Sequence, residues 1–123
     1  MLRGIRGATT VERNDAAEIA DSVRELLALL QAENGFAMDD IGAIIFSSTP
    51  DLTAAFPAAG ARGLGAAWAT VPLFGTVEIE HPGAPERCIR VLILWNTETP
   101  QRAVKHAYLR GAAVLRPDIA AKA

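Results

Sequence analysis

Residues 86–96, ERCIRVLILWN, constrain the fold most, because they read as a strand with two apolar faces. Side chains alternate between the faces of a strand. One face carries Cys88, Arg90, Leu92 and Leu94, and the other carries Ile89, Val91, Ile93 and Trp95. We therefore expect an inner strand that is covered on both sides. A buried guanidinium is strongly destabilising without an anionic partner, so Arg90 predicts an anion nearby.

The strongest helical pattern spans residues 15–33. Asp15 and Glu18 have the spacing of a capping box, and Asn34-Gly35 is typical of a helix end. Apolar residues follow at helical spacing on one face: Ile19, Val23, Leu26, Leu27 and Leu30. This periodicity predicts one long amphipathic helix.

Further strands are predicted over residues 2–11, which Gly4 and Gly7 loosen, over 42–48, and around Pro72 and Gly75. The Ala- and Gly-rich segment 51–67 is expected to form only short helical turns.

The C-terminal part predicts one more helix and one more strand. Thr99-Pro100 resembles an N-cap and first helical position, which predicts a helix over about 100–110 with Val104 and Tyr108 on one side. The sequence AAVL, residues 112–115, reads as a last strand, and residues 118–123 as a flexible tail.

These elements predict one domain, residues 1–117, of the α+β (mixed α/β) class. It should contain a mixed sheet of about five strands with one long and one shorter helix. Two helices leave one face of such a sheet partly uncovered, which favours self-association.

Composition excludes several functions. The net charge of −2 over 123 residues argues against a nucleic-acid partner. A single cysteine allows no internal disulfide, and neither a signal peptide nor a long apolar span is visible. We therefore expect a cytoplasmic protein without a membrane partner.

Six polar residues stand where a core would not need them: Arg6, Arg62, Glu78, Arg90, Tyr108 and Arg116. Each taken alone also has a structural explanation, such as an ion pair between Arg90 and Glu78. If they converge, the site has several fixed positive charges, a carboxylate and a phenol, but no nucleophile. Such a site suits a ligand with more than one carboxylate, and a reaction driven by positioning and electrostatics.

The cysteine, histidine and paired serine residues do not indicate a catalytic or metal-binding role. Cys88 is expected in the core, and His81 and His106 are expected in solvent. No metal-ligand spacing occurs, and Ser47-Ser48 lacks the context of a nucleophile.

Four segments resemble the monofunctional trimeric chorismate mutase family: RGIRGATTVE, STPDLTAAFPA, CIRV and HAYLRGAAVLRPD. The resemblance runs to about Asp118. It implies conversion of chorismate to prephenate by a Claisen rearrangement, in phenylalanine and tyrosine biosynthesis. It also implies a homotrimeric pseudo-α/β-barrel with active sites between subunits, and no metal or cofactor.

The resemblance also implies roles for individual residues. Arg90 would donate to the ether oxygen of chorismate, and Glu78 would accept from the ring hydroxyl. The substrate-binding residues would be Arg6, Phe56, Arg62, Phe74, Gly75, Thr76, Val77, Tyr108 and Arg116. The chain departs from the family at Ala59, where a lysine is common, and at Gly75, where a cysteine is.

Two other functions stay open. A trimer that binds a small carboxylate without turnover would act as a sensor. A hydrolase or deaminase of imine-like metabolites on a related trimeric fold would leave Glu78 and Tyr108 unexplained.

Overall fold

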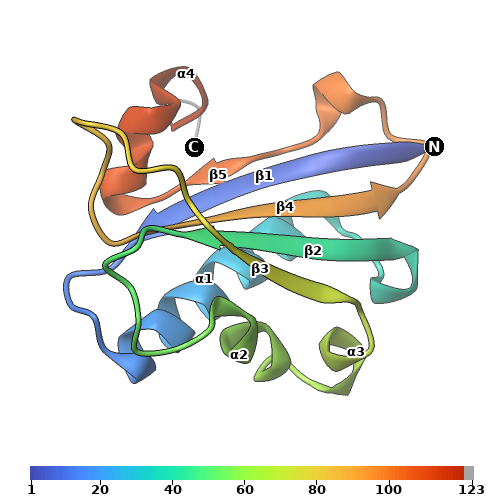
Figure 1. Ribbon diagram of the computed structural model, residues 1–123. Helices are drawn as coiled ribbons and strands as arrows, with labels where there is room; N and C mark the ends of the chain where they lie inside the picture. The colour runs from blue at the N-terminus through green and yellow to red at the C-terminus, as the bar shows by residue number, and fades with distance from the viewer. Residues whose placement is uncertain (121–123) are drawn as a thin grey trace.

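Five strands form one mixed sheet in the computed structural model, which describes residues 1–120 (Figure 1). The strands are β1 (Leu2–Thr10), β2 (Ile41–Ser48), β3 (Leu73–Val77), β4 (Cys88–Asn96) and β5 (Ala107–Tyr108). Their order across the sheet is β3-β2-β4-β1-β5. β4 is antiparallel to both neighbours, whereas the edge strands β3 and β5 are parallel to β2 and β1. The predicted five-stranded mixed sheet is confirmed.

The long helix α1 (Ala16–Asn34) also forms as predicted. The Asp15 carboxylate accepts from the Glu18 N–H at 3.0 Å, and Gly35 ends the helix with a left-handed φ of 70°. The capping box is only half formed, because the Glu18 carboxylate accepts from the Glu12 N–H at 2.6 Å instead of from Asp15. No helix among residues 1–120 is long and apolar enough to cross a membrane.

The segment 51–67 contains short helical turns, as expected. They are α2 (Pro57–Arg62) and the start of α3 (Ala66–Ala69), and a 3-10 turn, η1 (Met38–Asp40), precedes β2. α2 packs closely on α1 at Gly60, where an added Cβ would lie 2.8 Å from the Ala20 carbonyl oxygen. α1, α2 and α3 thus lie on one side of the sheet (Figure 1).

The main core lies between the sheet and α1. Ile44, Phe46, Ile89 and Ile93 point into it and are almost wholly buried. Gly7 of β1 faces the same way, and an added Cβ would lie 2.8 Å from Leu30 Cδ1. This glycine therefore allows α1 to approach the sheet closely and does not loosen the strand.

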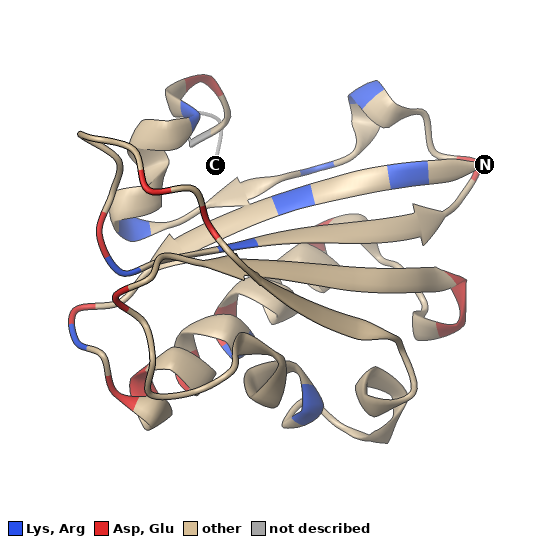
Figure 2. Ribbon diagram, in the orientation of Figure 1, with Lys and Arg blue, Asp and Glu red and all other residues tan. Residues whose placement is uncertain are grey.

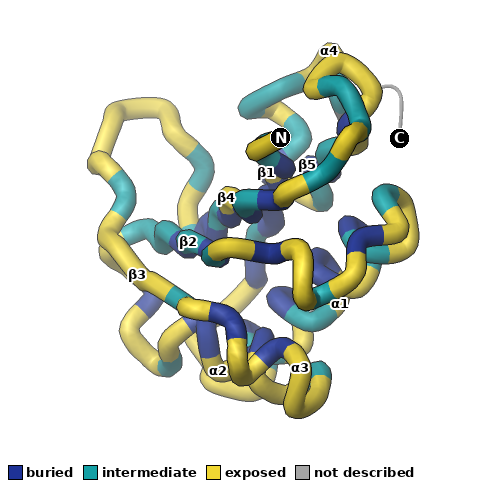
Figure 3. The backbone as a smooth tube through the Cα atoms, turned by 90° about the vertical axis from the view of Figure 1, so that its right-hand side faces the viewer, coloured by how far each residue is buried: buried dark blue, intermediate teal, exposed yellow. Residues whose placement is uncertain are grey.

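The opposite sheet face, here called the open face, carries Arg6, Ser47, Thr76, Arg90 and Leu92. The prediction that both faces of β4 are buried is wrong for a single chain, since Leu92 is 37% exposed. Phe74 of the neighbouring edge strand is 65% exposed, and most of β3 lies at the surface (Figure 3). Much of this sheet face thus has no cover among residues 1–120.

The helix predicted over about 100–110 is wrong. Only a 3-10 turn, η2 (Gln101–Ala103), forms there, and Pro100 has an extended ψ of 148°. The Thr99 hydroxyl does not cap a helix; it accepts a hydrogen bond from the Thr97 hydroxyl at 3.1 Å. Tyr108 therefore lies on the short strand β5 and not on a helix.

The outer edge of β1 explains why this segment stays extended. The Gln101 side-chain amide bonds both the N–H and the carbonyl of Gly4, at 2.9 and 2.8 Å. Further along, the Leu109 N–H donates to the Ala8 carbonyl at 2.9 Å. Pairing these buried or half-buried backbone groups outweighs the local preference for a helix.

The strand predicted at AAVL is also wrong, because Arg110–Leu115 forms a 3-10 helix, η3. A last short helix, α4 (Pro117–Ala120), follows it, and the rest of the expected flexible tail, residues 121–123, lies outside the described residues. Both pack over one end of the open face. There they form a second small core with Ala8, Cys88, Tyr108 and Ala112.

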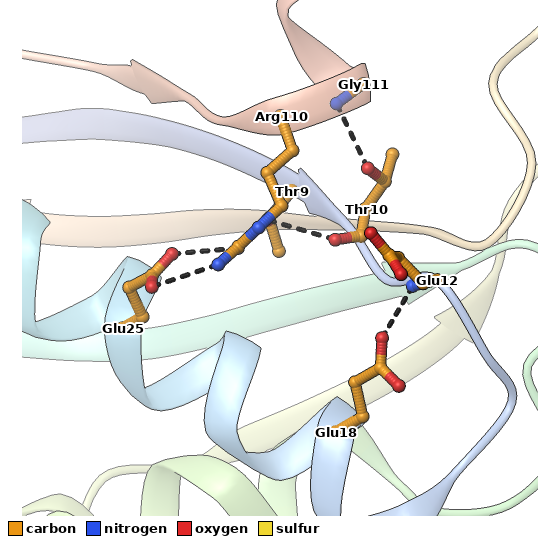
Figure 4. Close-up of polar contacts among 7 residues, drawn as sticks. All are labelled: Thr9, Thr10, Glu12, Glu18, Glu25, Arg110 and Gly111. Atoms are coloured by element: carbon orange, nitrogen blue, oxygen red, sulfur yellow. Dashed lines mark hydrogen bonds and ion pairs between the residues drawn. The ribbon is translucent and has the colours of Figure 1, made fainter.

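Arg110 joins η3 to the rest of the fold (Figure 4). Its guanidinium bonds both carboxylate oxygens of Glu25 on α1, at 2.8 and 3.1 Å, and the hydroxyl of the buried Thr9 at 3.3 Å. The next residue, Gly111, donates its N–H to the Thr10 hydroxyl at 3.0 Å. Arg110 has a left-handed φ of 50°, which is unfavourable for a residue with a Cβ.

Two substitutions of Arg110 are expected to distinguish the effect of its ion pair on stability from the effect of its backbone strain. Arg110→Ala should lower the free energy of unfolding by up to about 1 kcal/mol, since a half-exposed ion pair contributes little. Arg110→Gly loses the same pair but relieves a conformation that costs a non-glycine residue about 1–2 kcal/mol. Urea denaturation should therefore show the glycine variant to be the more stable of the two. A more stable alanine variant would contradict the strain.

Candidate active site

Strand register gathers polar side chains in one row across the open face. Residues paired directly across strands share a face. From β3 to β5 the row consists of Thr76, Ser47, Arg90, Ala8 and Tyr108. Two of the residues singled out from the sequence, Arg90 and Tyr108, thus lie in the same row with one small residue between them.

Arg90 has an anion beside it, as its position in the sequence predicted, and that anion is the Glu78 carboxylate. Its Nε lies 3.2 Å from Glu78 Oε2, a distance that defines an ion pair. The N–H is not aligned with that oxygen, so this buried nitrogen makes no regular hydrogen bond. The contact is therefore mainly electrostatic. Because Nε is buried while 43% of the side chain is exposed, the accessible part of Arg90 lies elsewhere on the side chain.

Glu78 is held from three directions at the end of β3. Its N–H donates to the Ser48 carbonyl at 2.9 Å, which keeps the chain against β2. Its carboxylate accepts from the Ser47 hydroxyl at 2.9 Å and from the Ile79 N–H at 3.1 Å. Figure 2 shows the result: an acidic position just after β3 lies beside the basic position on β4. Ser47 was not expected in the site, and its pairing with Arg90 across β2 and β4 appears only with the strand register.

Arg6 lies close to this pair. It stands opposite Leu92, so it is one diagonal step from Arg90 on the same face, about 7–8 Å between backbones. Its side chain is exposed, in agreement with a guanidinium that reaches toward a ligand or solvent. Tyr108, 8% exposed, lies on the neighbouring strand β5 opposite Ala8.

Arg116 also lies at this end of the open face, already paired with a carboxylate. Its Nε and Nη2 donate to the two oxygens of Asp118, at 3.1 and 2.9 Å. These bonds lower the pKa of Asp118 to about 2 and raise the pKa of Arg116, which Tyr108 raises further. Arg6, Glu78, Arg90, Tyr108 and Arg116 are thus brought to one face.

His106 is not in solvent, contrary to expectation. The Arg6 backbone N–H donates to its Nδ1 at 2.9 Å, so the ring joins the edge of β1. The pKa of His106 is lowered, first by partial burial and then by the charges of Arg6 and Arg116. A histidine two residues before Tyr108 gave no signal in the sequence, because its role depends on the unexpected extended path of this segment.

Cys88 is buried, as expected. Burial raises the pKa of its thiol, although the nearby charge of Arg90 opposes this effect. The sulfur is therefore a protonated packing atom at neutral pH and not a nucleophile.

Phe56 and Arg62 are not brought to the open face. Phe56 precedes α2 and Arg62 is its last residue, on the other side of the sheet, where Phe56 is 81% exposed. The segment from Phe74 to Val77 lies in the edge strand β3, whose outer backbone groups have no partner strand among residues 1–120. The expected site is thus divided between two distant regions of one chain.

Three cavities among the described residues lie away from this site. One of about 890 Å³ lies between the end of β1 and the start of α1, and two of about 530 and 600 Å³ border the 79–87 segment. None of these three is lined by Arg90 or Glu78. In a single chain, Arg90 lies on the open face with 43% of its side chain exposed.

Comparison with known proteins gives a consistent answer over nearly the whole chain. Residues 2–119 match the family model for chorismate mutase type I. The chain is 49% identical to Chorismate mutase AroH of Thermus thermophilus over 120 residues, which cover 97% of both proteins. It is 42% identical to Chorismate mutase AroH of Bacillus subtilis (strain 168), over 97% of this chain and 93% of that protein.

A solved structure agrees with these sequences. A chorismate mutase from Clostridium thermocellum superposes with a TM-score of 0.86 at 47% identity, over 90% of this chain and 97% of that one. At 47% identity this likeness is more than a likeness of fold. The chain belongs to the type I chorismate mutase family.

Proposed function

We propose that this protein rearranges chorismate to prephenate in the biosynthesis of phenylalanine and tyrosine, at sites formed between the subunits of a homotrimer. The observation that carries this proposal is Arg90, paired with Glu78 on the open face, much of which no other part of residues 1–120 covers. The names of the relatives support the reaction. The unpaired Cys88 is in keeping with a cytoplasmic enzyme.

Arg90 would supply the catalytic charge. In the rearrangement the bond between the ether oxygen and the ring stretches, and negative charge gathers on that oxygen. A guanidinium fixed beside it stabilises the transition state more than the ground state, which raises kcat. The ion pair with Glu78 restrains the guanidinium before substrate binds, so little reorganisation is needed.

The other groups would select the reactive shape of the substrate. Glu78 keeps one oxygen on the Ser47 hydroxyl, and its carboxylate has capacity left to accept from the ring hydroxyl of chorismate. Arg6 and Tyr108, on neighbouring strands, would each hold a carboxylate. Binding the compact conformer in this way makes the unimolecular reaction more probable without proton transfer or covalent attack.

Assembly would complete the site. A second chain seated on the open face would cover exposed apolar residues such as Leu92 and Phe74. It would bring its own Phe56, Arg62 and edge strand β3 to the first chain's Arg90. Cyclic symmetry would repeat this contact three times, closing a pseudo-α/β-barrel.

The reaction is tested by mixing the purified protein with chorismate and following the fall in its ultraviolet absorbance. Turnover that forms prephenate is the expected result. Binding of chorismate without loss of absorbance would instead support a sensor that binds small carboxylates. No binding and no turnover would contradict both functions.

The division of the site between subunits predicts complementation. Arg90→Ala should inactivate one half of the site, and Arg62→Glu, which repels a dianion, the other half. Refolding equal amounts of the two variants together should restore activity in mixed trimers. With random assembly of a cyclic trimer, roughly a quarter of all sites should then have both Arg90 and Arg62. Each variant refolded alone is the control. An Arg62→Glu protein with normal kcat/KM would remove Arg62 from the site, and mixtures without activity would contradict shared sites.

A further inference from the structure

We propose that His106 is a positioning residue, which holds Arg6 and Tyr108 in register through its unprotonated Nδ1. The inference rests on the proposed function, because it assumes that Arg6 and Tyr108 bind the substrate carboxylates. Neither the relatives nor the sequence pattern assigns this histidine a role. Its importance follows from how weakly β5 is otherwise attached to the sheet.

β5 is only two residues long, so backbone pairing alone holds Tyr108 poorly. Its ladder with β1 consists of Gly7 opposite Ala107 and Ala8 opposite Tyr108. One further bond, from the Leu109 N–H to the Ala8 carbonyl, closes its far end. On the near end no backbone acceptor reaches the Arg6 N–H, and the imidazole of His106 takes that place at 2.9 Å.

The hydrogen bond therefore acts on both residues together. Its donor is the backbone of Arg6, whose side chain lies on the open face. Its acceptor is two residues before Tyr108, whose ring lies on the same face. Removing the acceptor would break the bond that closes this end of the ladder and free the segment between η2 and β5 to shift along β1.

Only the neutral imidazole can do this, because Nδ1 must accept. Protonation would place an N–H against the Arg6 N–H and break the contact. The charged or titratable groups around the ring are Arg6 on β1, Arg116 after η3 with its partner Asp118 on α4, Tyr108 on β5, and the adjacent Lys105, which pairs with Glu33 of α1.

The two arginines oppose protonation, and so does partial burial, which together lower the pKa of His106 below its usual 6.5. A lowered pKa in the folded state means that the unfolded chain takes up the proton first. The contact is thus fully present above about pH 6.5 and is lost as the pH falls through the lower pKa of the folded state. Substrate binding should follow the same direction.

The test compares three variants by steady-state kinetics between pH 5 and 8. His106→Leu removes the acceptor and should raise KM by about 2- to 10-fold, the usual range for one hydrogen bond, with kcat changed less. His106→Asn places Oδ1 where Nδ1 was, so it should retain normal KM at pH 7.5. Gln101→Leu, which removes the non-titrating bonds to Gly4 on the same edge, is the matched control.

The pH profile separates positioning from general stability. For the wild type and Gln101→Leu, KM should rise as the pH falls through the lowered pKa of His106, whereas His106→Asn should show no such rise because it cannot titrate there. Circular dichroism and the assembled mass of each variant verify folding. In the free protein, the Arg6 amide resonance in nitrogen-15 NMR should shift with the protonation of His106.

Two results would overturn the proposal: a normal KM in His106→Leu, or a His106→Asn protein as impaired as the leucine variant and with the same acid rise in KM as the wild type. Failure of the proposed function is recognised separately, with Arg6→Ala. If Arg6→Ala leaves KM unchanged, the role of Arg6 in binding is wrong. If Arg6→Ala raises KM and His106→Leu does not, only the role of His106 is wrong.

Discussion

Arg90→Ala is expected to lower kcat by at least about 10²–10³-fold, the effect of removing one preorganised donor to a developing negative charge. The loss should be greater than for a neutral donor, because a guanidinium stays charged throughout the reaction. KM should change less, since Arg6 and Tyr108 would still hold the carboxylates. Stopped assays that follow chorismate absorbance at saturating substrate measure this directly.

The same substitution should leave the protein folded. The Arg90 side chain is 43% exposed and its ion pair with Glu78 is correspondingly screened, so the free energy of unfolding should fall by no more than about 1 kcal/mol. Glu78 would keep its hydrogen bonds to Ser47 and Ile79. A normal circular dichroism spectrum and assembled mass are therefore expected in the inactive variant.

Arg90→Lys provides the matched control. It retains the charge but loses the planar fork that can contact Glu78 and a substrate oxygen together, so most of the activity should still be lost. A kcat near the wild-type value in either variant would contradict the catalytic role of Arg90. Such a result would mean that the ion pair between Arg90 and Glu78 has only a structural role.

Phe46→Ala is expected to cause the largest loss of stability, about 3–5 kcal/mol. Phe46 is the largest of the fully buried side chains, at 1% exposure. It lies on β2 between Gly75 of β3 and Val91 of β4, so its direct neighbour on β3 has no side chain to fill the cavity. Such a loss is a large part of the 5–15 kcal/mol that typically stabilises a domain.

Urea denaturation at one fixed subunit concentration measures this effect, because assembly adds to apparent stability. Phe46→Leu, which leaves a smaller void, should lose only about 1–2 kcal/mol. An alanine variant with a loss under about 1 kcal/mol would show that the core relaxes into the cavity. In that case the packing around β2 would be looser than the structure indicates.

Much of the fold could be predicted because strong local patterns coincide with burial. The α1 prediction depended on Asp15, Gly35 and an apolar stripe between them, and each of these works as its residue type suggests. The position of Arg90 in an apolar strand likewise predicted a nearby anion, and the Glu78 carboxylate lies 3.2 Å away. In these places, local preference and tertiary packing favour the same structure.

The helix prediction for the segment after Thr99 failed because tertiary contacts override the local pattern of that segment. Its cap-like Thr-Pro pair predicts a helix, but the unpaired edge of β1 recruits Gln101 and His106 as hydrogen-bond partners. The sequence contains no local trace of that competition, since the donors and acceptors are about a hundred residues apart. His106 and Ser47 were missed for the same reason: strand pairing, and not neighbouring sequence, places them in the site.

The expected burial of both faces of β4 was wrong for a related reason. Apolar alternation indicates that a face will be covered but does not say whether the same chain covers it. Here α1 covers one face, and the other is left with Leu92 and half-buried Leu94. The roles of Phe56 and Arg62 stay predictions until the assembled protein is tested.

The alternation along β4 also has a consequence for protein engineering. Ile89, Val91 and Ile93 maintain the interior, while the positions between them belong to a different surface. In the proposed trimer, randomising Leu92 and Leu94 would therefore change how tightly subunits associate, with little risk of misfolding the single chain. Libraries with random residues at these two positions would therefore vary subunit association while leaving the core of each chain unchanged.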